Sequence, residues 1–394
     1  MNVEIIMGES EDDAEVAISE PPQDPDEFFS KNAFRIVYQT NNFFLPQLRD
    51  LIEKGEVLNL RPEYQRRLRW SVKQKSRLIE SLLLNIPVPP VFLYESDAAR
   101  YEVMDGQQRL NAVREFIASD FALASLEVLA PLNGLRYSRC PPRIKRSLDR
   151  ASISAIVLLL ESENEKSPKS LSMTDVRRFI FDRLNSGGTQ LNAQEIRNAL
   201  SQGEFNKLIV ELTRFNLFTK VFDIPPYIES DPNDYYENPL RQKNSLYANM
   251  GDCQLVLRYF ALKTDANIRG SIKSMLDRAM RTEVSITERD ELEIEFKDRF
   301  TFLFELFNGK PFALQPDEKG RIRISAAIYD ASMVAINELW KYRAQITADK
   351  AAVQQRMTDA TNSVEHAQVL TGQGNTAKAI KERIKLLKSI LQPE

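Results

Sequence analysis

The alternation of apolar and polar positions divides the chain into a mixed region and a helical region. Up to about residue 205, helix-spaced apolar residues alternate with short apolar runs of strand length, and beyond it long amphipathic helical patterns dominate. The first 30 residues are acidic and poor in aromatics, which predicts disorder. We therefore expect an α+β protein with a disordered tail at 1–30, a mixed domain at 31–205 and a helical domain at 206–394.

Start and stop signals place several elements in the mixed region. Ser71 and Gln74 form the spacing of a capping box, and the helix that they open is expected to end at Asn85 and Pro87. Further helices are expected to begin at Gly106, Ser172 and Asn192. Apolar runs predict strands at 91–95, 101–105 and 153–160, the last of them deep in the sheet.

The helical region has three clear amphipathic stretches and one interruption. Helices are predicted over 253–260 and 326–335, and a basic amphipathic helix over 378–388. Residues 222–247 contain four prolines and are predicted to form a long loop, whose length suggests a role in function or partner contact.

Composition excludes several classes of protein. His366 is the single histidine, so neither an HNH nuclease nor an HExxH metalloprotease can be built from this sequence. Cys140 and Cys253 lack CxxC spacing, which argues against a zinc ribbon. No apolar run reaches membrane-spanning length and no secretory leader is recognisable, so we expect a cytoplasmic protein without a membrane partner.

Charge is distributed unevenly along the chain. The net charge is −3, but residues 1–30 hold ten acidic residues and neither lysine nor arginine. The remainder has 53 basic and 46 acidic residues. Such a body attracts polyanions such as DNA, which the acidic tail would repel or mimic.

The strongest candidate site is the segment Asp105-Gly106-Gln107-Gln108-Arg109 at the end of a predicted strand. The N–H groups of a helix N-terminus favour an anion, and glycine lets a phosphate approach the backbone closely. Arg109 supplies a bidentate donor, Asp105 is a candidate Mg²⁺ ligand, and Gln107 or Gln108 could position a water molecule. The alternative is that Asp105 caps the helix and Arg109 forms a surface ion pair.

Two further segments have a polar pattern that suits ligand binding. Residues 61–70 combine four arginines with Tyr64 and Trp70, as phosphate binding with base stacking requires, although Trp70 could equally serve as a hydrophobic staple. Residues 181–198 predict a helix, a glycine turn and a capped helix, which alone is an ordinary helical hairpin.

A basic segment and an acidic segment complete the candidates. Arg143, Lys145, Arg146 and Arg150 follow Cys140, where they could bind nucleic acid, lower the thiol pKa, or form a solvated face. The acidic cluster could bind the metal of a carboxylate nuclease, but it is more typical of a solvated face; its members are Glu288, Asp290, Glu291, Glu293 and Glu295.

Several segments, taken together and in order, resemble the N-terminal domain of GmrSD-type restriction endonucleases, a family similar to ParB and sulfiredoxin. The resemblance covers about residues 35–205. It rests on Tyr64-Gln65-Arg66, Trp70, Leu78-Ile79-Glu80-Ser81, the proline-rich segment 86–90, Asp105-Gly106-Gln107-Gln108-Arg109 and Arg183-Leu184-Asn185-Ser186-Gly187-Gly188.

The resemblance implies a ParB/sulfiredoxin-like domain with a small mixed sheet that binds and hydrolyses a nucleoside triphosphate with Mg²⁺ in prokaryotic anti-phage defence. The implied catalytic residues are Asp105, Gln107, Gln108 and Arg109, with Asp105 on the metal. The implied nucleotide contacts are Tyr64, Gln65, Arg66, Gly106, Asn185, Gly187 and Gly188. The predicted nucleic-acid contacts are Arg67, Arg69, Arg143, Lys145 and Arg146.

This sequence departs from the many relatives that carry an HNH nuclease domain, because it lacks the necessary histidines. We therefore expect an NTPase that gates DNA sensing or a separate nuclease or effector subunit. The alternative is a nucleotide- or DNA-binding module that docks such a nuclease without hydrolysis. The nucleotide base, modified phage DNA as the trigger, and homo-oligomerisation are left open.

Overall fold

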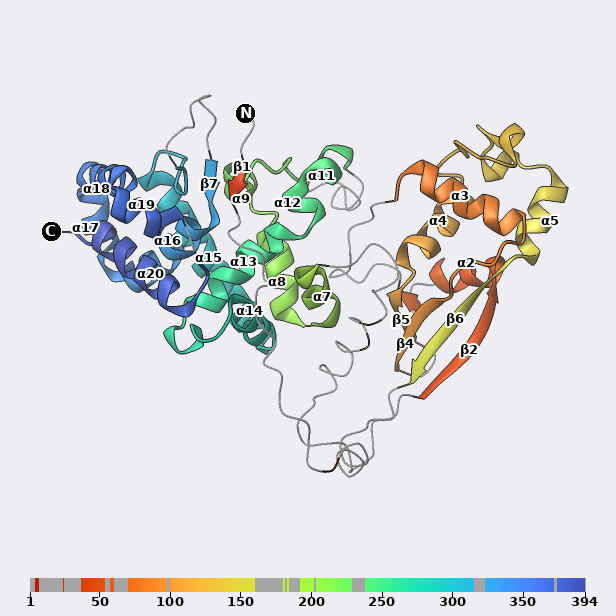
Figure 1. Cartoon of the computed structure of the whole chain (residues 1–394), viewed down its shortest axis with the longest axis horizontal. Coiled ribbons are helices and arrows are strands. Elements are labelled where there is room, and N and C mark those ends of the chain that lie inside the picture. Colours follow the sequence, from red (N-terminus) through yellow and green to blue (C-terminus); the bar gives the residue numbers. More distant parts are fainter. Residues whose placement is uncertain are drawn as a thin grey trace. The chain divides into compact units, whose positions relative to one another are not determined.

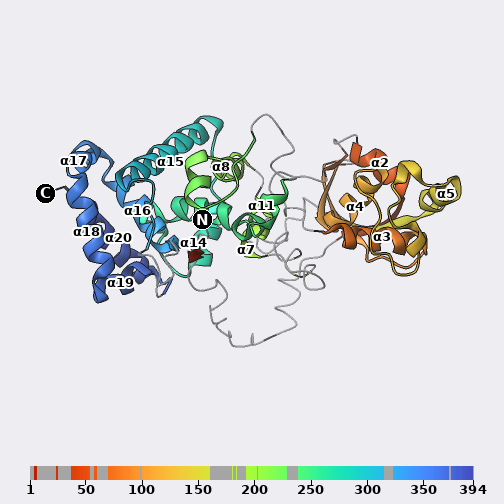
Figure 2. The same cartoon turned by 90° about the horizontal axis from the view of Figure 1, so that it is seen from above.

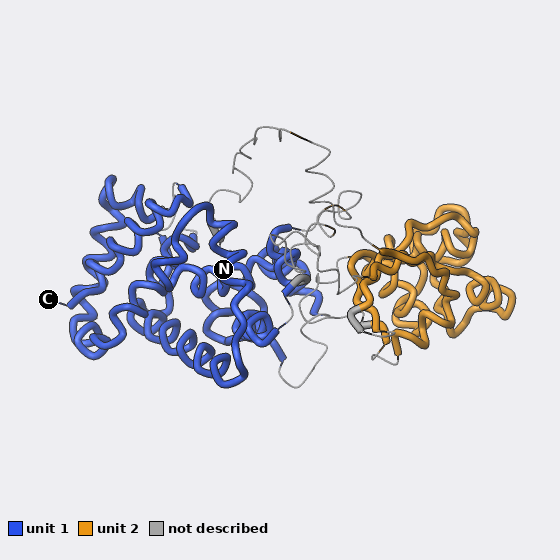
Figure 3. Tube along the Cα trace, turned by 90° about the horizontal axis from the view of Figure 1, so that it is seen from below, with its two compact units in different colours: residues 1–17, 192–394 blue, residues 18–191 orange. Residues whose placement is uncertain are grey.

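The chain folds into two compact units, which are described separately. Unit 1 comprises Met1–Ala17 and Asn192–Glu394, and unit 2 comprises Ile18–Leu191 (Figure 3). In the computed structural model the described residues are 4–6, 24, 37–53, 57–59, 70–97, 100–159, 180, 183, 192–201, 203–228, 238–314, 323–371 and 374–393.

Unit 2 is built on a five-stranded mixed sheet with the order β2-β6-β4-β5-β3 (Figure 1). β6 is antiparallel to β2 and parallel to β4, while β5 is antiparallel to β4 and parallel to β3. The three strands expected from the sequence and the α+β class are confirmed. The strands are β2 (Val37–Phe44), β3 (Leu58–Asn59), β4 (Val91–Asp97), β5 (Arg100–Asp105) and β6 (Ser152–Leu159).

The core of unit 2 lies between the sheet and helices α2 (Leu45–Glu53), α3 (Val72–Leu83) and α4 (Gln107–Ile117). Figures 1 and 2 both show α3 and α4 side by side. Alternate strand residues point into this core because successive side chains of a strand face opposite sides. The buried strand residues are Val91, Leu93, Val103, Ile153, Ala155 and Val157.

The capping box predicted at the start of α3 is confirmed. The Ser71 N–H donates to Gln74 Oε1 at 2.9 Å, and the Gln74 N–H donates to Ser71 Oγ at 3.4 Å. Asn85 ends the helical segment in the left-handed region, with φ of 55°. The side chain of Trp70 is partly buried against the core of unit 2.

A buried carboxylate on α3 organises the loop after α4. Glu80 accepts three backbone N–H groups, from Glu127 at 3.2 Å, Val128 at 2.9 Å and Leu129 at 2.7 Å. The hydrogen bond from Leu129 is the largest cause that lowers the pKa of the Glu80 carboxyl. Because these bonds favour the ionised carboxylate, Glu80 stabilises the folded state of unit 2 when it is deprotonated.

Replacing Glu80 with glutamine is expected to destabilise unit 2 by about 1–3 kcal/mol at pH 7, because the amide loses an acceptor and leaves buried N–H groups unsatisfied. The pKa of Glu80 is lowered in the folded state, so its stabilisation is present above the unfolded pKa and is lost as pH falls through the folded value. The difference between wild type and variant in urea unfolding should therefore shrink below about pH 4.

The matched control is Glu127→Gln, since the Glu127 side chain is 66% exposed and pairs only with exposed Arg77 among the described residues. We expect this surface variant to change stability by less than about 1 kcal/mol. Equal losses in the two variants would contradict the role assigned to Glu80.

Unit 1 is mostly helical, and α13, α16 and α20 confirm the helices predicted around 253–260, 326–335 and 378–388. The helices are α7 (Ala193–Leu200), α8 (Glu204–Leu212), α9 (Asn216–Val221), α11 (Pro239–Lys243), α12 (Ser245–Ala248), α13 (Gly251–Leu262), α14 (Ile272–Met280), α15 (Ile286–Leu306), α16 (Ala326–Glu338), α17 (Arg343–Ala348), α18 (Lys350–Asn362), α19 (Val364–Thr371) and α20 (Ala377–Leu391). None of the helices in the described residues has the length and hydropathy needed to cross a membrane.

The centre of unit 1 is formed by α13 and α16, whose residues are almost all buried. Figure 2 shows α18 and α20 next to each other at the C-terminal end of this unit. Phe222, which directly follows α9, and Phe300 of α15 pack against Tyr329 of α16, and Phe218 of α9 packs against Phe300 in the same aromatic cluster. The predicted cap of α7 is confirmed, because Asn192 Oδ1 accepts the N–H groups of Gln194 and Glu195.

Two expectations about irregular segments are wrong in part. Residues 222–247 were expected to be a loop, but α11 and α12 occupy 239–243 and 245–248. Pro239 is tolerated in the first turn of α11, where its missing N–H has no intrahelical role, and Asn238 caps that helix. Glu4–Ile6, within the segment expected to be disordered, forms strand β1 parallel to β7 (Arg323–Ser325), because two consecutive isoleucines favour pairing.

Candidate functional site

The turn between β5 and α4 holds the strongest sequence motif. Gly106 has φ of 98° and is the N-cap of α4 without a side-chain cap. A Cβ at this position would lie 2.4 Å from Val91 Cγ1 on β4. Glycine is therefore required here both by the left-handed backbone and by the packing of the turn against β4.

Asp105 and Arg109 are joined across this turn. Arg109 Nη2 forms an ion pair with Asp105 Oδ2, and Arg109 Nη1 donates to the carbonyl of Pro89 at 2.6 Å. Asp105 therefore does not cap α4, and its carboxylate is held by the arginine one turn later. The side chain of Asp105 stays 35% exposed, whereas that of Arg109 is 13% exposed, so the carboxylate is the more accessible partner.

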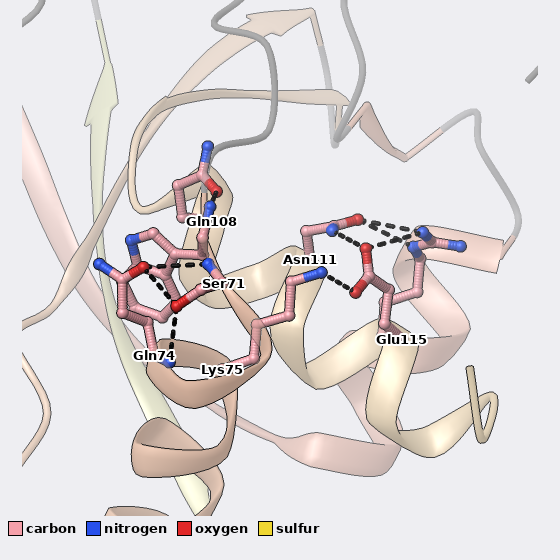
Figure 4. A network of polar contacts seen from close by, with 8 residues as sticks. Ser71, Gln74, Lys75, Gln108, Asn111 and Glu115 are labelled. Carbon is pink, nitrogen blue, oxygen red and sulfur yellow. Dashed lines mark hydrogen bonds and ion pairs between the residues drawn. The ribbon is translucent and has the colours of Figure 1, made fainter. Parts of the chain in front are cut away.

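A second contact brings the end of the arginine-rich segment to the same turn. The N–H of Trp70 donates to Gln108 Oε1 at 3.2 Å, although the two residues are 38 positions apart (Figure 4). Trp70 is the last residue of the arginine-rich motif 61–70, and it is the residue of that motif that the structure describes. Gln108 therefore links the Asp105–Arg109 motif to Trp70, the last residue of the arginine-rich motif.

A polar network behind the turn fixes α3 against α4. Lys75 of α3 forms an ion pair with Glu115, and both side chains are largely buried, at 17% and 14% exposed. Asn111 donates to Glu115 and accepts hydrogen bonds from Arg114 at 3.1 and 3.2 Å (Figure 4). This network orients the N-terminal turn of α4 relative to Trp70 and Ser71, and sequence analysis missed it because its partners are distant in the chain.

Several predicted site residues lie outside the described residues. These are Tyr64, Gln65, Arg66, Arg67 and Arg69 of the arginine-rich segment, and Asn185, Gly187 and Gly188 of the glycine turn. The start of the helix predicted at Ser172 also lies outside them, and of that helix the structure describes Ile180 and Arg183. The described site therefore consists of the Asp105–Arg109 turn, its support from Pro89 and Val91, and its link to Trp70.

The predicted basic residues lie on and around α5 (Pro142–Arg150). Arg143 and Arg146 are exposed, while Lys145 is half-buried and donates to the carbonyl of Ser138 at 3.3 Å. The lysine also stands over the ring of Tyr137, 5.2 Å from its centroid. Lys145 therefore contacts other residues of unit 2, whereas Arg143 and Arg146 are exposed to solvent.

The expectation that this basic segment could lower the pKa of Cys140 is wrong. Burial is the largest effect on the thiol and raises its pKa, and the opposing effect of Lys145 is smaller. Cys140 is buried, and its sulfur contacts the carbonyl of Arg136 at 3.5 Å. A buried thiol with a raised pKa is a poor nucleophile, which removes the main support for sulfiredoxin-like chemistry at this residue.

The acidic residues of α15 do not converge on one point. Glu288 belongs to the capping box with Ser285, Glu293 pairs with Lys297, and Glu295 accepts from Tyr259 and Lys263. Nowhere in the described part of the chain do three or more histidine, cysteine, aspartate or glutamate side chains form a group that could hold a metal. A nuclease centre based on these carboxylates is not supported.

The residues of the Asp105 turn fit a magnesium nucleotide better than a metal alone. Asp105 is a single exposed carboxylate, and Mg²⁺ is usually held by one or two carboxylates together with phosphate oxygens. The N-terminus of α4 has the polarity that favours a phosphate group. Arg109 uses two of its five N–H groups on Asp105 and Pro89, so it can orient the carboxylate and still donate to a phosphate through another N–H group.

Comparison with known proteins identifies the family of this region. Residues 48–202 match the family described as the GmrSD restriction endonuclease, N-terminal domain. The resemblance drawn from the sequence motifs is thereby confirmed, and it indicates a restriction-type defence role. Neither a curated protein nor a solved structure matches the chain.

Proposed function

Because residues 48–202 form a domain of the GmrSD restriction endonuclease N-terminal family, we propose that this chain is a nucleotide-dependent component of restriction-type anti-phage defence. The domain binds and hydrolyses a nucleoside triphosphate at the Asp105 turn, and the nucleotide state gates DNA sensing or a partner effector. The observation that carries the proposal is the bond between Trp70 and Gln108, which joins two motifs at one helix N-terminus.

Each residue of the turn has a distinct part in this proposal. Asp105 would hold Mg²⁺ through its exposed carboxylate, and Arg109 orients that carboxylate while the Pro89 carbonyl fixes the guanidinium. The backbone at Gly106 and Gln107 would face the phosphates, where a helix N-terminus stabilises negative charge. Gln108 positions Trp70 through its backbone N–H.

The metal would supply neutralisation of phosphate charge, as it does in other phosphoryl-transfer sites. The chain itself would contribute by holding the groups that bind the nucleotide in fixed positions. The Lys75–Glu115–Asn111 network holds α3 against α4, so that Trp70, which precedes α3, stays beside the first turn of α4. Phosphoryl transfer depends mainly on positioning and electrostatics, and such a rigid base suits it.

Replacing Arg109 with alanine is expected to weaken nucleotide binding by about 10- to 100-fold, because one charged hydrogen-bonding group contributes roughly 1.5–3 kcal/mol. The measurement is a titration of a fluorescent nucleoside triphosphate with Mg²⁺. A loss of this size supports a site at the turn, and unchanged affinity would remove the turn from the proposal.

Arg77→Ala is the matched control for this experiment. It removes an arginine from the neighbouring helix α3, but the Arg77 side chain is 51% exposed and pairs with the exposed Glu127. We expect it to keep near wild-type affinity. Arg109→Lys separates charge from geometry, since lysine cannot reproduce the planar fork that reaches both Asp105 and Pro89.

A further inference from the structure

A row of arginines lies on one face of α5. Arg143, Arg146 and Arg150 stand at positions i, i+3 and i+7, which places them on the same side of a helix. All three are exposed, and Leu148, which faces the opposite side, is 1% exposed and packs into the core of unit 2. The helix is therefore anchored by its apolar side and presents a basic side to solvent.

These arginines differ from most others in the protein. In the described part of the chain, no hydrogen bond or ion pair joins the side chain of Arg143, Arg146 or Arg150 to another residue. By contrast, Arg109 and Arg258 are held by aspartates, and Arg197 pairs with Asp277. The row is therefore available to an external anion without the loss of an internal contact.

The position of Arg143 argues against a purely structural role. It lies in the first turn of α5, and that turn contains no acidic residue. A positive charge at a helix N-terminus opposes the helix dipole and costs roughly 0.3–1 kcal/mol. A basic residue kept at this place is consistent with recognition of a negatively charged ligand and not with stabilisation of the helix.

The chemistry of the face favours double-stranded DNA over a single strand. Single-strand binding surfaces combine basic residues with exposed aromatic rings on which bases stack. Near the row, Tyr137 is half-buried, covered by Lys145 and packed against Phe116, and Phe44, which is 49% exposed and pairs with Ser152, is a single exposed ring. Three arginines beside one exposed ring do not form a platform for successive bases, and they suit the phosphate backbone, which is contacted without reading the sequence.

We propose that the exposed arginine face of α5, formed by Arg143, Arg146 and Arg150, is a docking surface for the phosphate backbone of duplex DNA. The inference rests on the proposed role in DNA sensing and names its surface. It changes the set predicted from the sequence, because Arg150 joins the face and Lys145 leaves it. The face is separate in sequence and structure from the Asp105 turn.

The test is fluorescence anisotropy of a labelled duplex of mixed sequence, titrated with the full chain at several salt concentrations. The variant Arg143→Gln/Arg146→Gln/Arg150→Gln should bind more weakly. Each lost phosphate contact should reduce the slope of log affinity against log salt by about 0.9, so the triple variant should lose about 2.7. Its urea unfolding should match that of the wild type, because the unfavourable charge lost at Arg143 is offset by the favourable charge lost at Arg150 in the last turn of α5.

The control removes the same charge from exposed positions in unit 1, with Lys243→Gln/Lys310→Gln/Lys385→Gln. We expect this variant to keep the wild-type slope. Equal slopes for the α5 variant and the wild type, absence of duplex binding by the wild type, or binding restricted to single strands would each overturn the proposal. Phosphate release measured on the same α5 variant should be unchanged, so failure of the DNA surface is distinguishable from failure of the nucleotide site.

Discussion

Replacing Gly106 with alanine is expected to destabilise unit 2 by about 2–5 kcal/mol, because backbone strain and a steric clash add together. The residue has φ of 98°, a region that costs an L-amino acid free energy. The new Cβ would lie 2.4 Å from Val91 Cγ1, so β4 or the start of α4 must shift. That shift would also displace Asp105 and Arg109 and lower nucleotide affinity.

The variant Gly134→Ala separates the free-energy cost of the steric clash from that of the backbone strain. Gly134 belongs to the same unit and has φ of 83°, but a Cβ there would meet no atom within 4 Å. The control should therefore show only the strain, about 1–2 kcal/mol. If both variants lose the same stability, the close packing of Gly106 against Val91 has no energetic role.

The two tryptophans make this measurement specific, because Trp70 lies in unit 2 and Trp340 in unit 1. In a Trp340→Phe background, urea unfolding followed by fluorescence reports on unit 2 alone. The reverse substitution, Trp70→Phe, leaves a probe for unit 1.

Replacing Asp330 with asparagine is expected to destabilise unit 1 by about 3–5 kcal/mol, because the change leaves a buried arginine without its counter-charge. Arg258 Nε contacts the two carboxylate oxygens of Asp330 at 3.0 and 2.8 Å, and the side chains are 3% and 2% exposed. Arg383 lies near the pair and is also buried, so the variant would leave two buried positive charges. Unfolding of unit 1, read from Trp340, should shift to lower urea.

The exposed pair of Asp265 and Lys381 provides the control, with side chains 78% and 45% exposed. Asp265→Asn should change stability by less than about 1 kcal/mol. The double variant Arg258→Met/Asp330→Leu should recover part of the loss, because apolar residues of similar volume can replace a buried pair while Arg383 still lacks the carboxylate. A single variant Asp330→Asn as stable as the wild type would show that the pair is not needed.

Elements fixed by local signals could be predicted from the sequence. The capping boxes at Ser71 and Asn192 depend on residues three positions apart, and both are present. Strand β6 was predicted from its continuous apolar run, and the start of α4 from the glycine after a strand. The family could be recognised because each of its motifs is a short run of residues and the motifs follow one another in a fixed order along the chain.

Contacts between distant residues could not be predicted. The three N–H groups that Glu80 accepts lie 47 to 49 positions away, and Gln108 meets Trp70 across 38 positions. The pKa of Cys140 depends on burial, which neighbouring charges in the sequence do not reveal. The hydrogen bond from Arg109 to the Pro89 carbonyl could not be predicted either, although the proline-rich segment 86–90 was already part of the family resemblance.

We propose above all that the Asp105 turn supports Mg²⁺-dependent hydrolysis of a nucleoside triphosphate. The direct test is phosphate release by the purified full chain with ATP, GTP, CTP and UTP in turn, with and without Mg²⁺ and duplex DNA, beside Arg109→Ala. We expect Mg²⁺-dependent release with at least one nucleotide and its loss in the variant. Release that persists in Arg109→Ala, or none with any nucleotide and DNA, would contradict it; binding without release would indicate a nucleotide-binding module that docks a separate nuclease.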